Sequence, residues 1–322
     1  MNREKKNFIG EHVNYKLIRL KNNPSTTNKP KSILIKSNMK RNNKSKRVTF
    51  SDYCYFDITE KEYDTYKNKI KHFDSVTYYY LGDIKLEVKF GDNYYDYLRG
   101  KDTISHFVIE NRNFKFLIGY VRGVLKKYCS NNLYYWYFCD LVIGEKYGGK
   151  GLLYNLCVHM IHKVVMRANR GYCIVDADKN GFGMMHVIQK LDYIVNIKVN
   201  RLLIYSVSVM TMGVIERFFT CAFGDIKYLF LDGIKQWIIL ETGKVMKVYH
   251  LHHGSDRMDD AVVLDDIVKD NDPDVCIMFC FPENSTFKTI LTDLGIIETK
   301  VANIVSWRMD FFDWHQILTS DF

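Results

Sequence analysis

The stretch YYWYFCDLVIGEKYGGKGLLYNLCVH, Tyr134–His159, determines how the rest of the sequence is interpreted. Its apolar run over 135–143 predicts a buried strand, and the apolar spacing that begins near Leu152 predicts a helix. Between these runs, Gly148, Gly149 and Gly151 predict a tight turn. Because the first N–H groups of a helix have no acceptor within it, the pattern leaves N–H groups open above the turn.

This turn is a candidate site for an anion. Helix N-termini bind phosphate groups, and glycine lets the backbone approach a pyrophosphate closely because it has no Cβ. Lys150 adds a positive charge. The alternative is a strand–helix junction that needs its glycines for geometry alone. The spacings of mononucleotide and P-loop sites, GxGxxG and GxxxxGKS/T, are absent from the turn.

Residues 141–152, LVIGEKYGGKGL, resemble the acyl-CoA pyrophosphate loop of the GNAT superfamily of N-acyltransferases. The loop pattern of that superfamily, Gln/Arg-x-x-Gly-x-Gly/Ala, falls on Gly148, Gly151 and Leu153 in one register and on Lys146, Gly149 and Gly151 in another. The resemblance implies acetyl-CoA or a longer acyl-CoA as co-substrate and no metal. The residues that it assigns to acyl-CoA binding are Leu141, Val142, Ile143, Gly148, Gly149, Lys150, Gly151, Leu152, Leu153 and Asn180.

The order of predicted elements also resembles GNAT domains, twice over. In the first half a hairpin over 106–121 precedes the central strand, and a strand over 172–176 and a helix over 180–193 follow the central helix. The second half has a hairpin over 237–249, an acidic helix over 256–269, a strand over 275–281 and a helical segment over 282–296. The resemblance implies a mixed α/β (α+β) protein of two tandem GNAT-like domains, each a mainly antiparallel sheet flanked by helices. The expected domains are a flexible basic tail over 1–50, a GNAT-like acyl-CoA-binding domain over 51–205 and a degenerate second GNAT-like domain over 206–322.

An amphipathic pattern over 58–73 predicts a helix near the start of the first domain. Thr59 is the expected N-cap, with Glu62 as its capping-box partner. In the second half no glycine loop precedes the 256–269 helix, and acidic residues at its start, where the sequence reads Gly254-Ser-Asp-Arg-Met258, would repel a pyrophosphate. The acyl-CoA loop is therefore expected in the first half alone.

The reaction that the resemblance implies is attack of an amine on a thioester carbonyl, which needs a neutral amine and a donor for the oxyanion. Tyr137 and Asp140 on the central strand are the catalytic candidates. Strand alternation predicts that they lie on opposite faces, so that one of them at most faces the substrate. The alternative for Asp140 is a hydrogen-bonded polar group near a strand end. The tyrosine that many relatives use as an acid falls on Ile188, so an acid has to come from elsewhere.

The tandem halves, with Asn284-Ser-Thr-Phe287 in the second, also resemble glycylpeptide N-myristoyltransferases. That resemblance implies transfer of a longer acyl chain. It also implies that backbone amides of Tyr137–Asp140 polarise the thioester. Acetyl transfer to an amine of a protein or small molecule is the first hypothesis, and myristoyl-like transfer is subordinate to it.

The positive charge lies in the N-terminal tail. Residues 1–47 contain fourteen Lys or Arg and two Glu, which leaves 32 basic against 35 acidic residues elsewhere. The tail is therefore expected to contact nucleic acid only non-specifically. Arg47-Val-Thr-Phe50 resembles the docking motif of type 1 protein phosphatase, with Val48 and Phe50 filling pockets. This motif supports a different hypothesis, a catalytically degenerate interaction protein, and the alternative is that Val48 and Phe50 begin the first strand.

Cysteine usage and hydrophobicity bear on the compartment. Eight cysteines without CxxC pairs, and no signal peptide, predict an intracellular protein, cytoplasmic or nuclear. The apolar run over 202–215 is too short to span a membrane. A zinc site is one interpretation of His250, His252 and His253, but no nearby carboxylate or cysteine completes a ligand set.

Overall fold

The computed structural model describes residues 52–58, 62–74, 78–81, 84–91, 103–128, 133–177, 182–253, 261–270 and 275–321. The chain divides into two units, Met1–Arg47 and Val48–Phe322. Every described residue belongs to the second unit. The predicted basic tail, Val48, Phe50 and Asn180 lie outside the described residues, so phosphatase docking through the tail stays a prediction.

Strands and helices alternate along the described chain. The first part comprises β1 Tyr53–Ile58, α1 Tyr63–Asp74, β2 Tyr78–Leu81, β3 Ile84–Phe90, β4 Thr103–Asn111, β5 Leu117–Tyr128, β6 Leu133–Ile143, the 3-10 helix η2 Glu145–Tyr147, α3 Leu152–Arg167, β7 Gly171–Asp176, α4 Phe182–Val195 and β8 Lys198–Val207. The second part comprises α5 Val209–Phe223, β9 Ile226–Phe230, β10 Lys235–Ile239, β11 Val245–His253, β12 Ala261–Val262, α6 Leu264–Asp270, β13 Val275–Pro282, α7 Thr286–Asp293, β14 Lys300–Trp307 and the 3-10 helices η3 Trp314–Gln316 and η4 Thr319–Asp321. No helix in the described part of the chain is both long and apolar enough to cross a membrane.

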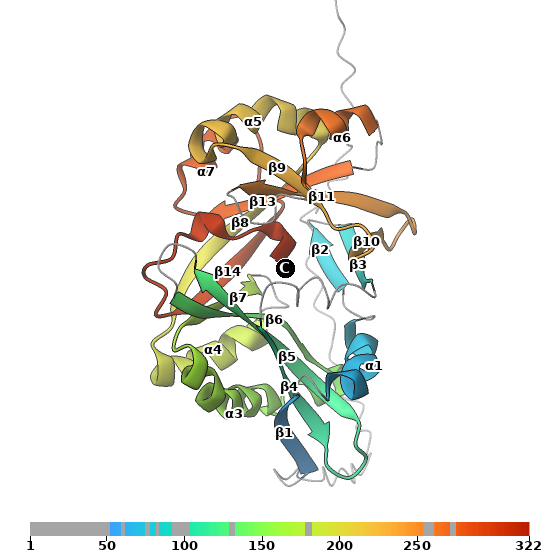
Figure 1. The fold of residues 1–322 in the computed structure, drawn as a ribbon, viewed down its shortest axis with the longest axis vertical. Helices are drawn as coiled ribbons and strands as arrows, with labels where there is room; N and C mark the ends of the chain where they lie inside the picture. Colours follow the sequence, from blue (N-terminus) through green and yellow to red (C-terminus); the bar gives the residue numbers. More distant parts are fainter. Residues whose placement is uncertain are drawn as a thin grey trace, which may run out of the picture. The chain divides into compact units, whose positions relative to one another are not determined.

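One sheet joins the fourteen strands of the described residues. Its order is β1-β4-β5-β6-β7-β14-β8-β13-β11-β10-β3-β2, and β9 and β12 extend from β11. Within this sheet the pairs β6–β7 and β11–β13 are parallel, and the other pairs are antiparallel. Helices flank the sheet (Figure 1). The predicted fold class, a mixed α/β protein with a mainly antiparallel sheet, is confirmed.

The two halves repeat the same plan and exchange their last strands. In the first half, β6 and β7 are parallel and joined through α3, and in the second β11 and β13 are parallel and joined through α6. The chain then passes through α4 into β8, which pairs with β13, and through α7 into β14, which pairs with β7. β8 and β14 also pair with each other at the centre (Figure 1). Each half therefore completes the sheet of the other.

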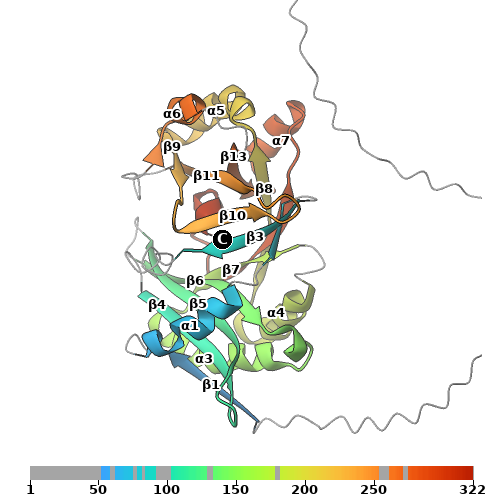
Figure 2. The ribbon, with the colours of Figure 1, turned by 90° about the vertical axis from the view of Figure 1, so that its right-hand side faces the viewer.

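The expected domain boundary lies within one of the exchanged strands. The division at 205/206 falls inside β8, which hydrogen-bonds to β13 and β14 of the second half. β3 of the first half likewise pairs with β10 of the second, and the two lie side by side in Figure 2. Separating the halves would break backbone hydrogen bonds along several strands. The boundary stays a prediction.

Apolar clusters cover both faces of the sheet. On the face that α3 and α4 cover, Trp136 of the sheet belongs to one cluster with Leu156 and Val164 of α3, among others. The equivalent face of the second half packs on α5, α6 and α7. On the opposite face, α1 covers β4 and β5. Farther along that face a large cluster joins β3, β5–β8, β10, β11, β13 and β14 to the C-terminal segment 309–317.

Most predicted elements are present, but two helices begin later in the chain than the sequence predicts. Residue Ile58 ends β1, where it pairs with His106, and α1 begins at Tyr63; Thr59 lies outside the described residues. In the second half, Ala261–Val262 form β12 against β9, and α6 begins at Leu264. In both places a tertiary strand pairing outweighs a helical sequence pattern.

Candidate functional site

The strands β6 and β7 separate part-way along their length. They pair at Trp136–Gly171, Tyr137–Tyr172 and Phe138–Cys173. Beyond Phe138, β6 continues to Ile143 with no β7 partner among the described residues. Over 139–143, the edge of β6 that faces away from β5 therefore has no strand partner among the described residues. Backbone groups at such an edge are strong donors and acceptors toward a bound molecule.

A β-bulge at Asp140 interrupts the pairing of β6 with β5. Cys139 pairs with Arg122, but Val142 pairs with Tyr120, so two residues of β6 oppose one of β5. Asp140 has a φ of 49°, which is left-handed backbone. Aspartate tolerates this conformation better than most residues.

The bulge overturns the prediction that Tyr137 and Asp140 lie on opposite faces. Asp140 forms an ion pair with Arg122. Arg122 lies on the same face of β5 as Val124, the partner of Tyr137. A bulge shifts the alternation of a strand, and here it brings the Asp140 carboxylate to the face of Tyr137.

Arg122 is a buried charge that Asp140 neutralises. Its side chain is 0% exposed and that of Asp140 is 12% exposed. His106 is the β4 partner of Arg122 and is buried. Burial, together with the positive charge of Arg122, lowers the pKa of His106 to about 3. These contacts fit the alternative of a satisfied polar group for Asp140, and a catalytic role for it stays a prediction.

Tyr137 lies in an aromatic cluster. It is 3% exposed and stacks on Tyr172 with ring centroids 5.0 Å apart. Lys126 Nζ lies 5.1 Å from the centre of its ring. Phe312 and Trp314 from the C-terminal segment contact Tyr172. An acceptor would reach Tyr137 only by displacing part of this cluster, so its catalytic role also stays a prediction.

The glycine-rich turn ends at an uncapped helix start. Gly151, with φ of 72°, is the N-cap of α3 and offers no side-chain cap. Gly149 has φ of 70°, and a Cβ at either glycine would meet no atom within 4 Å. The glycines are therefore needed for backbone conformation, and the space in front of them is open. The predicted strand, turn and helix are confirmed.

The electrostatics at this helix start favour an anion. The first turn of α3 contains no acidic residue, and Leu152 is buried and anchors the helix to the sheet. Lys150 Nζ and Lys146 Nζ lie 5.0 and 5.2 Å from the centre of the Tyr147 ring. In contrast, the first turn of α6 carries Asp265 and Asp266. Among the described residues, the first half alone has a helix start of this kind after its central strand.

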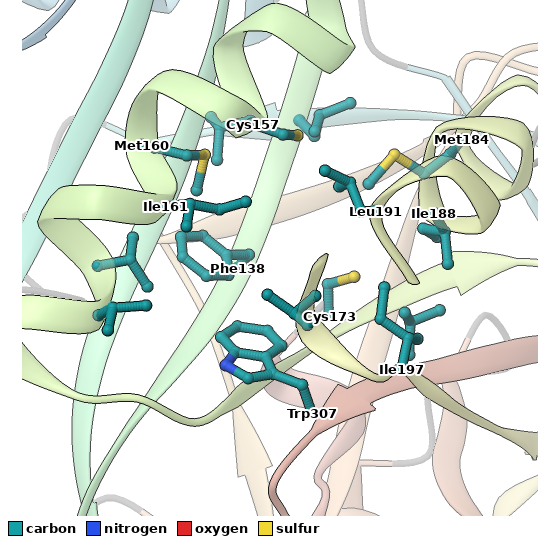
Figure 3. A pocket seen from close by; sticks show the side chains of 16 residues that line it. Phe138, Cys157, Met160, Ile161, Cys173, Met184, Ile188, Leu191, Ile197 and Trp307 are labelled. Atoms are coloured by element: carbon teal, nitrogen blue, oxygen red, sulfur yellow. The ribbon is translucent and has the colours of Figure 1, made fainter. Parts of the chain in front are cut away.

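A cavity of about 100 Å³ lies between the sheet and helices α3 and α4, beside the residues at which β6 and β7 separate. Figure 3 shows its apolar side chains, which come from α3, α4 and the strands β5–β7 and β14. Phe138 and Cys173, the last paired residues of β6 and β7, both line it. Burial raises the pKa of the Cys157 and Cys173 thiols in its wall to about 12, so neither is a nucleophile near neutral pH.

Other residues assigned from the sequence divide between the two faces of β6. Leu141, Ile143 and Leu153 pack on the α3 face, and Leu141 also lines the cavity. Val142 packs on the α1 face. Ile188, the position of the expected tyrosine, lines the cavity. The sequence did not indicate the cavity, because its walls come from segments up to 186 positions apart, Val121 and Trp307 being the outermost.

Two of the three histidines of β11, His250 and His253, hold the C-terminal segment. His250 Nδ1 lies 2.9 Å from Thr319 Oγ1, and His253 Nε2 lies 2.8 Å from the His315 carbonyl oxygen. Within the described ranges, no three His, Cys, Asp or Glu side chains are grouped as metal ligands would be.

A curated protein is similar to this sequence over most of its length. The uncharacterised protein L340 of Acanthamoeba polyphaga mimivirus is 31% identical over 291 residues, which cover 86% of this chain and 82% of L340. The chain belongs to the L340 family. No protein-family model matches the chain.

Solved structures that resemble this L340-family chain in part are GNAT proteins. A tandem GNAT protein from the clavulanic acid biosynthesis pathway covers 79% of this chain and 98% of its own, with 9% identity and a TM-score of 0.43. NAA60 of Arabidopsis thaliana in complex with a bisubstrate analogue covers 47% of this chain and 87% of its own, with 13% identity and a TM-score of 0.33. Both TM-scores are below 0.5.

Proposed function

We propose that the protein is an acyl-CoA-dependent N-acyltransferase whose co-substrate binds in the first half. The observation that carries this proposal is the combination of two features on one strand. β6 leaves β7 beyond Phe138, and the same strand leads through the Gly149 turn into the uncapped start of α3. A pyrophosphate would accept hydrogen bonds from the first N–H groups of α3. The pantetheine arm would lie along the open edge of β6.

The chemistry follows from the same geometry. The amine of the acceptor attacks the thioester carbonyl, and charge develops on the carbonyl oxygen. Backbone N–H groups on the open edge of β6, near the bulge at Asp140, can donate to this oxyanion without reorganisation. Positioning of the two reactants supplies a further part of the rate. Leu141, Val142, Ile143 and Asn180 stay proposed contacts of acyl-CoA, and Tyr137 and Asp140 stay proposed catalytic groups.

Acetyl-CoA is expected to raise the melting temperature of the full chain. A ligand at a hundred times its Kd stabilises the native state by about 2.7 kcal/mol, which is a rise of roughly 4–5 °C for a protein of this size. Gly151→Asp is expected to abolish the rise, because the carboxylate would stand at the phosphate site. Thermal unfolding followed by circular dichroism measures both quantities.

Gly243→Asp is the matched control for Gly151→Asp. Gly243 has φ of 68° and open space around its Cβ position, but it lies in the turn between β10 and β11. Both variants carry the same backbone cost, about 1–2 kcal/mol for a side chain in left-handed conformation. Gly243→Asp should therefore keep the acetyl-CoA shift. If the wild-type protein unfolds cooperatively and acetyl-CoA does not change its melting temperature, the proposed function is refuted.

The cavity behind β6 favours a short acyl chain over a myristoyl chain. Its volume of about 100 Å³ is smaller than the roughly 150 Å³ cavity that takes up benzene. Hexanoyl-CoA should bind more tightly than acetyl-CoA, since each buried CH₂ contributes about 0.8 kcal/mol. Myristoyl-CoA should gain nothing beyond hexanoyl-CoA.

Ile188→Phe is expected to remove the advantage of hexanoyl-CoA and to keep the response to acetyl-CoA. The larger side chain would occupy the cavity that Ile188 lines. Ile194→Phe on the same helix is the control, because Ile194 is exposed and does not line the cavity. Isothermal titration with the three thioesters gives the affinities. Tighter binding of hexanoyl-CoA that survives Ile188→Phe would place the acyl chain elsewhere.

A further inference from the structure

Ser285, His315 and Asp313 form a chain of hydrogen bonds in the second half. His315 Nε2 lies 3.0 Å from Ser285 Oγ, and His315 Nδ1 lies 2.9 Å from Asp313 Oδ1. Ser285 follows β13 and begins α7, and the other two residues lie in the segment after β14. Figure 1 labels β13, α7 and β14. Folding thus brings together side chains thirty positions apart.

Neighbouring hydrogen bonds determine which atoms of Ser285 and His315 act as donors. Ser285 Oγ accepts a hydrogen bond from the Phe287 N–H at 3.3 Å, as the N-cap of α7. Its own O–H is then available to His315 Nε2. An ionised Asp313 can only accept, so His315 Nδ1 carries the proton that it donates. This is the tautomer in which a histidine can act as general base toward a serine.

Further contacts hold Asp313 and His315 in place. Asp313 Oδ1 also accepts from the His315 N–H at 3.0 Å, which fixes the carboxylate beside the ring. Partial burial raises the pKa of Asp313, but the hydrogen bonds from His315 outweigh it, and the pKa of this carboxyl is lowered. His253 Nε2 lies 2.8 Å from the His315 carbonyl oxygen and stacks on Phe223, with ring centroids 4.2 Å apart.

Ser285 stands where a strand turns into a helix. The Thr286 N–H that follows it belongs to the first turn of α7, where N–H groups have no acceptor within the helix. A nucleophile at this place has an oxyanion donor next to it, as in the strand–turn–helix sites of serine hydrolases. The backbone of Ser285 is unstrained, with φ of −70° and ψ of 143°, and the GxSxG pattern is absent around it.

We propose that Ser285, His315 and Asp313 are a second catalytic centre, a nucleophilic serine that cleaves esters or thioesters of small carboxylic acids. Ser285 Oγ attacks the carbonyl carbon while its proton passes to His315 Nε2. The bond to the alcohol or thiol breaks, and that leaving group takes the proton from His315. Water then attacks the acyl-serine with His315 as base, which releases the carboxylic acid and restores the serine. The net reaction consumes one ester or thioester and one water.

The test is labelling of the full chain with a fluorophosphonate probe, together with hydrolysis of p-nitrophenyl acetate. The expected result is one labelled peptide, which contains Ser285. Labelling should disappear in Ser285→Ala. Turnover should fall at least about 100-fold in Ser285→Ala and in His315→Gln, which keeps a hydrogen-bonding side chain but no base.

Ser208→Ala is the matched control. Ser208 caps α5 by the same kind of bond, with its Oγ 3.1 Å from the Thr211 N–H, and its hydroxyl partner is Thr211 rather than a histidine. It loses a cap as Ser285→Ala does, but Ser208 is exposed and Ser285 is buried. Turnover of the two variants is therefore compared at a temperature at which thermal unfolding shows both to be folded. A folded wild-type protein that is not labelled, or equal turnover in Ser285→Ala and wild type, would overturn the proposal. The three residues would then only fasten the C-terminal segment to α7. Neither readout involves acyl-CoA binding at α3.

Discussion

Replacing Asp140 by asparagine is expected to lower the free energy of unfolding by about 3–5 kcal/mol, because it leaves the guanidinium of Arg122 buried without its carboxylate. The side chain of Arg122 is 0% exposed. Asparagine has the size of aspartate and also tolerates the left-handed backbone at this position. The substitution therefore removes the charge and little else. Urea unfolding of the variant and the wild type gives the difference.

Two further variants make this prediction specific. Asp140→Asn with Arg122→Met should recover most of the lost stability, since apolar groups often replace a buried ion pair without cost. Asp310→Asn breaks the exposed ion pair of Asp310 with Lys198 and should cost at most about 1 kcal/mol. If Asp140→Asn cost no more than Asp310→Asn, water would have to reach Arg122, and the bulge would not depend on the ion pair.

The second large effect is a loss of stability on acidification that His106 causes. The pKa of His106 is about 3 in the folded protein because the ring is buried beside Arg122, and it is about 6.5 in an unfolded chain. Between these values the unfolded state binds a proton that the folded state does not. Stability therefore falls as the pH falls from about 6.5 to about 3, by about 1.4 kcal/mol per pH unit from this residue alone.

His106→Gln is expected to remove this dependence. Glutamine stays neutral at every pH, so the slope of the unfolding free energy against pH should decrease by one proton, about 1.4 kcal/mol per unit, between pH 6 and pH 4. Because slopes are compared, a lower stability of the variant at pH 7 does not affect the result. Equal slopes in the variant and the wild type would mean that His106 takes up its proton in the folded protein.

The local elements were predictable wherever neighbouring residues decide them. The β4–β5 hairpin, β6 and α3 appear where apolar spacing and turn residues predict them. The start of α1 was not predictable, because Ile58 pairs with His106 of β4. The face of Asp140 was also predicted wrongly. Alternation holds in a regular strand, and the bulge depends on the pairing of β6 with β5.

The candidate sites differ in how far the sequence reveals them. The Gly149–Gly151 turn could be found from the sequence, because its backbone conformation depends on two glycines separated by one residue along the chain. The cavity behind Phe138 and the contact of Ser285 with His315 could not. Their parts come from strands and helices that meet only after folding.

The sequence by itself determined the alternation of strands and helices, the repeated order of the two halves and the glycine turn that opens α3. Hydrogen bonds within a helix or turn, and the period of apolar side chains, involve residues a few positions apart, so these features can be seen in the sequence. Only the tertiary structure decided that β8 and β14 are exchanged, that β6 bulges at Asp140 and that Ser285 meets His315. Each of these depends on pairing between distant segments, and sequence spacing carries no record of which strand edge or side chain a residue will meet.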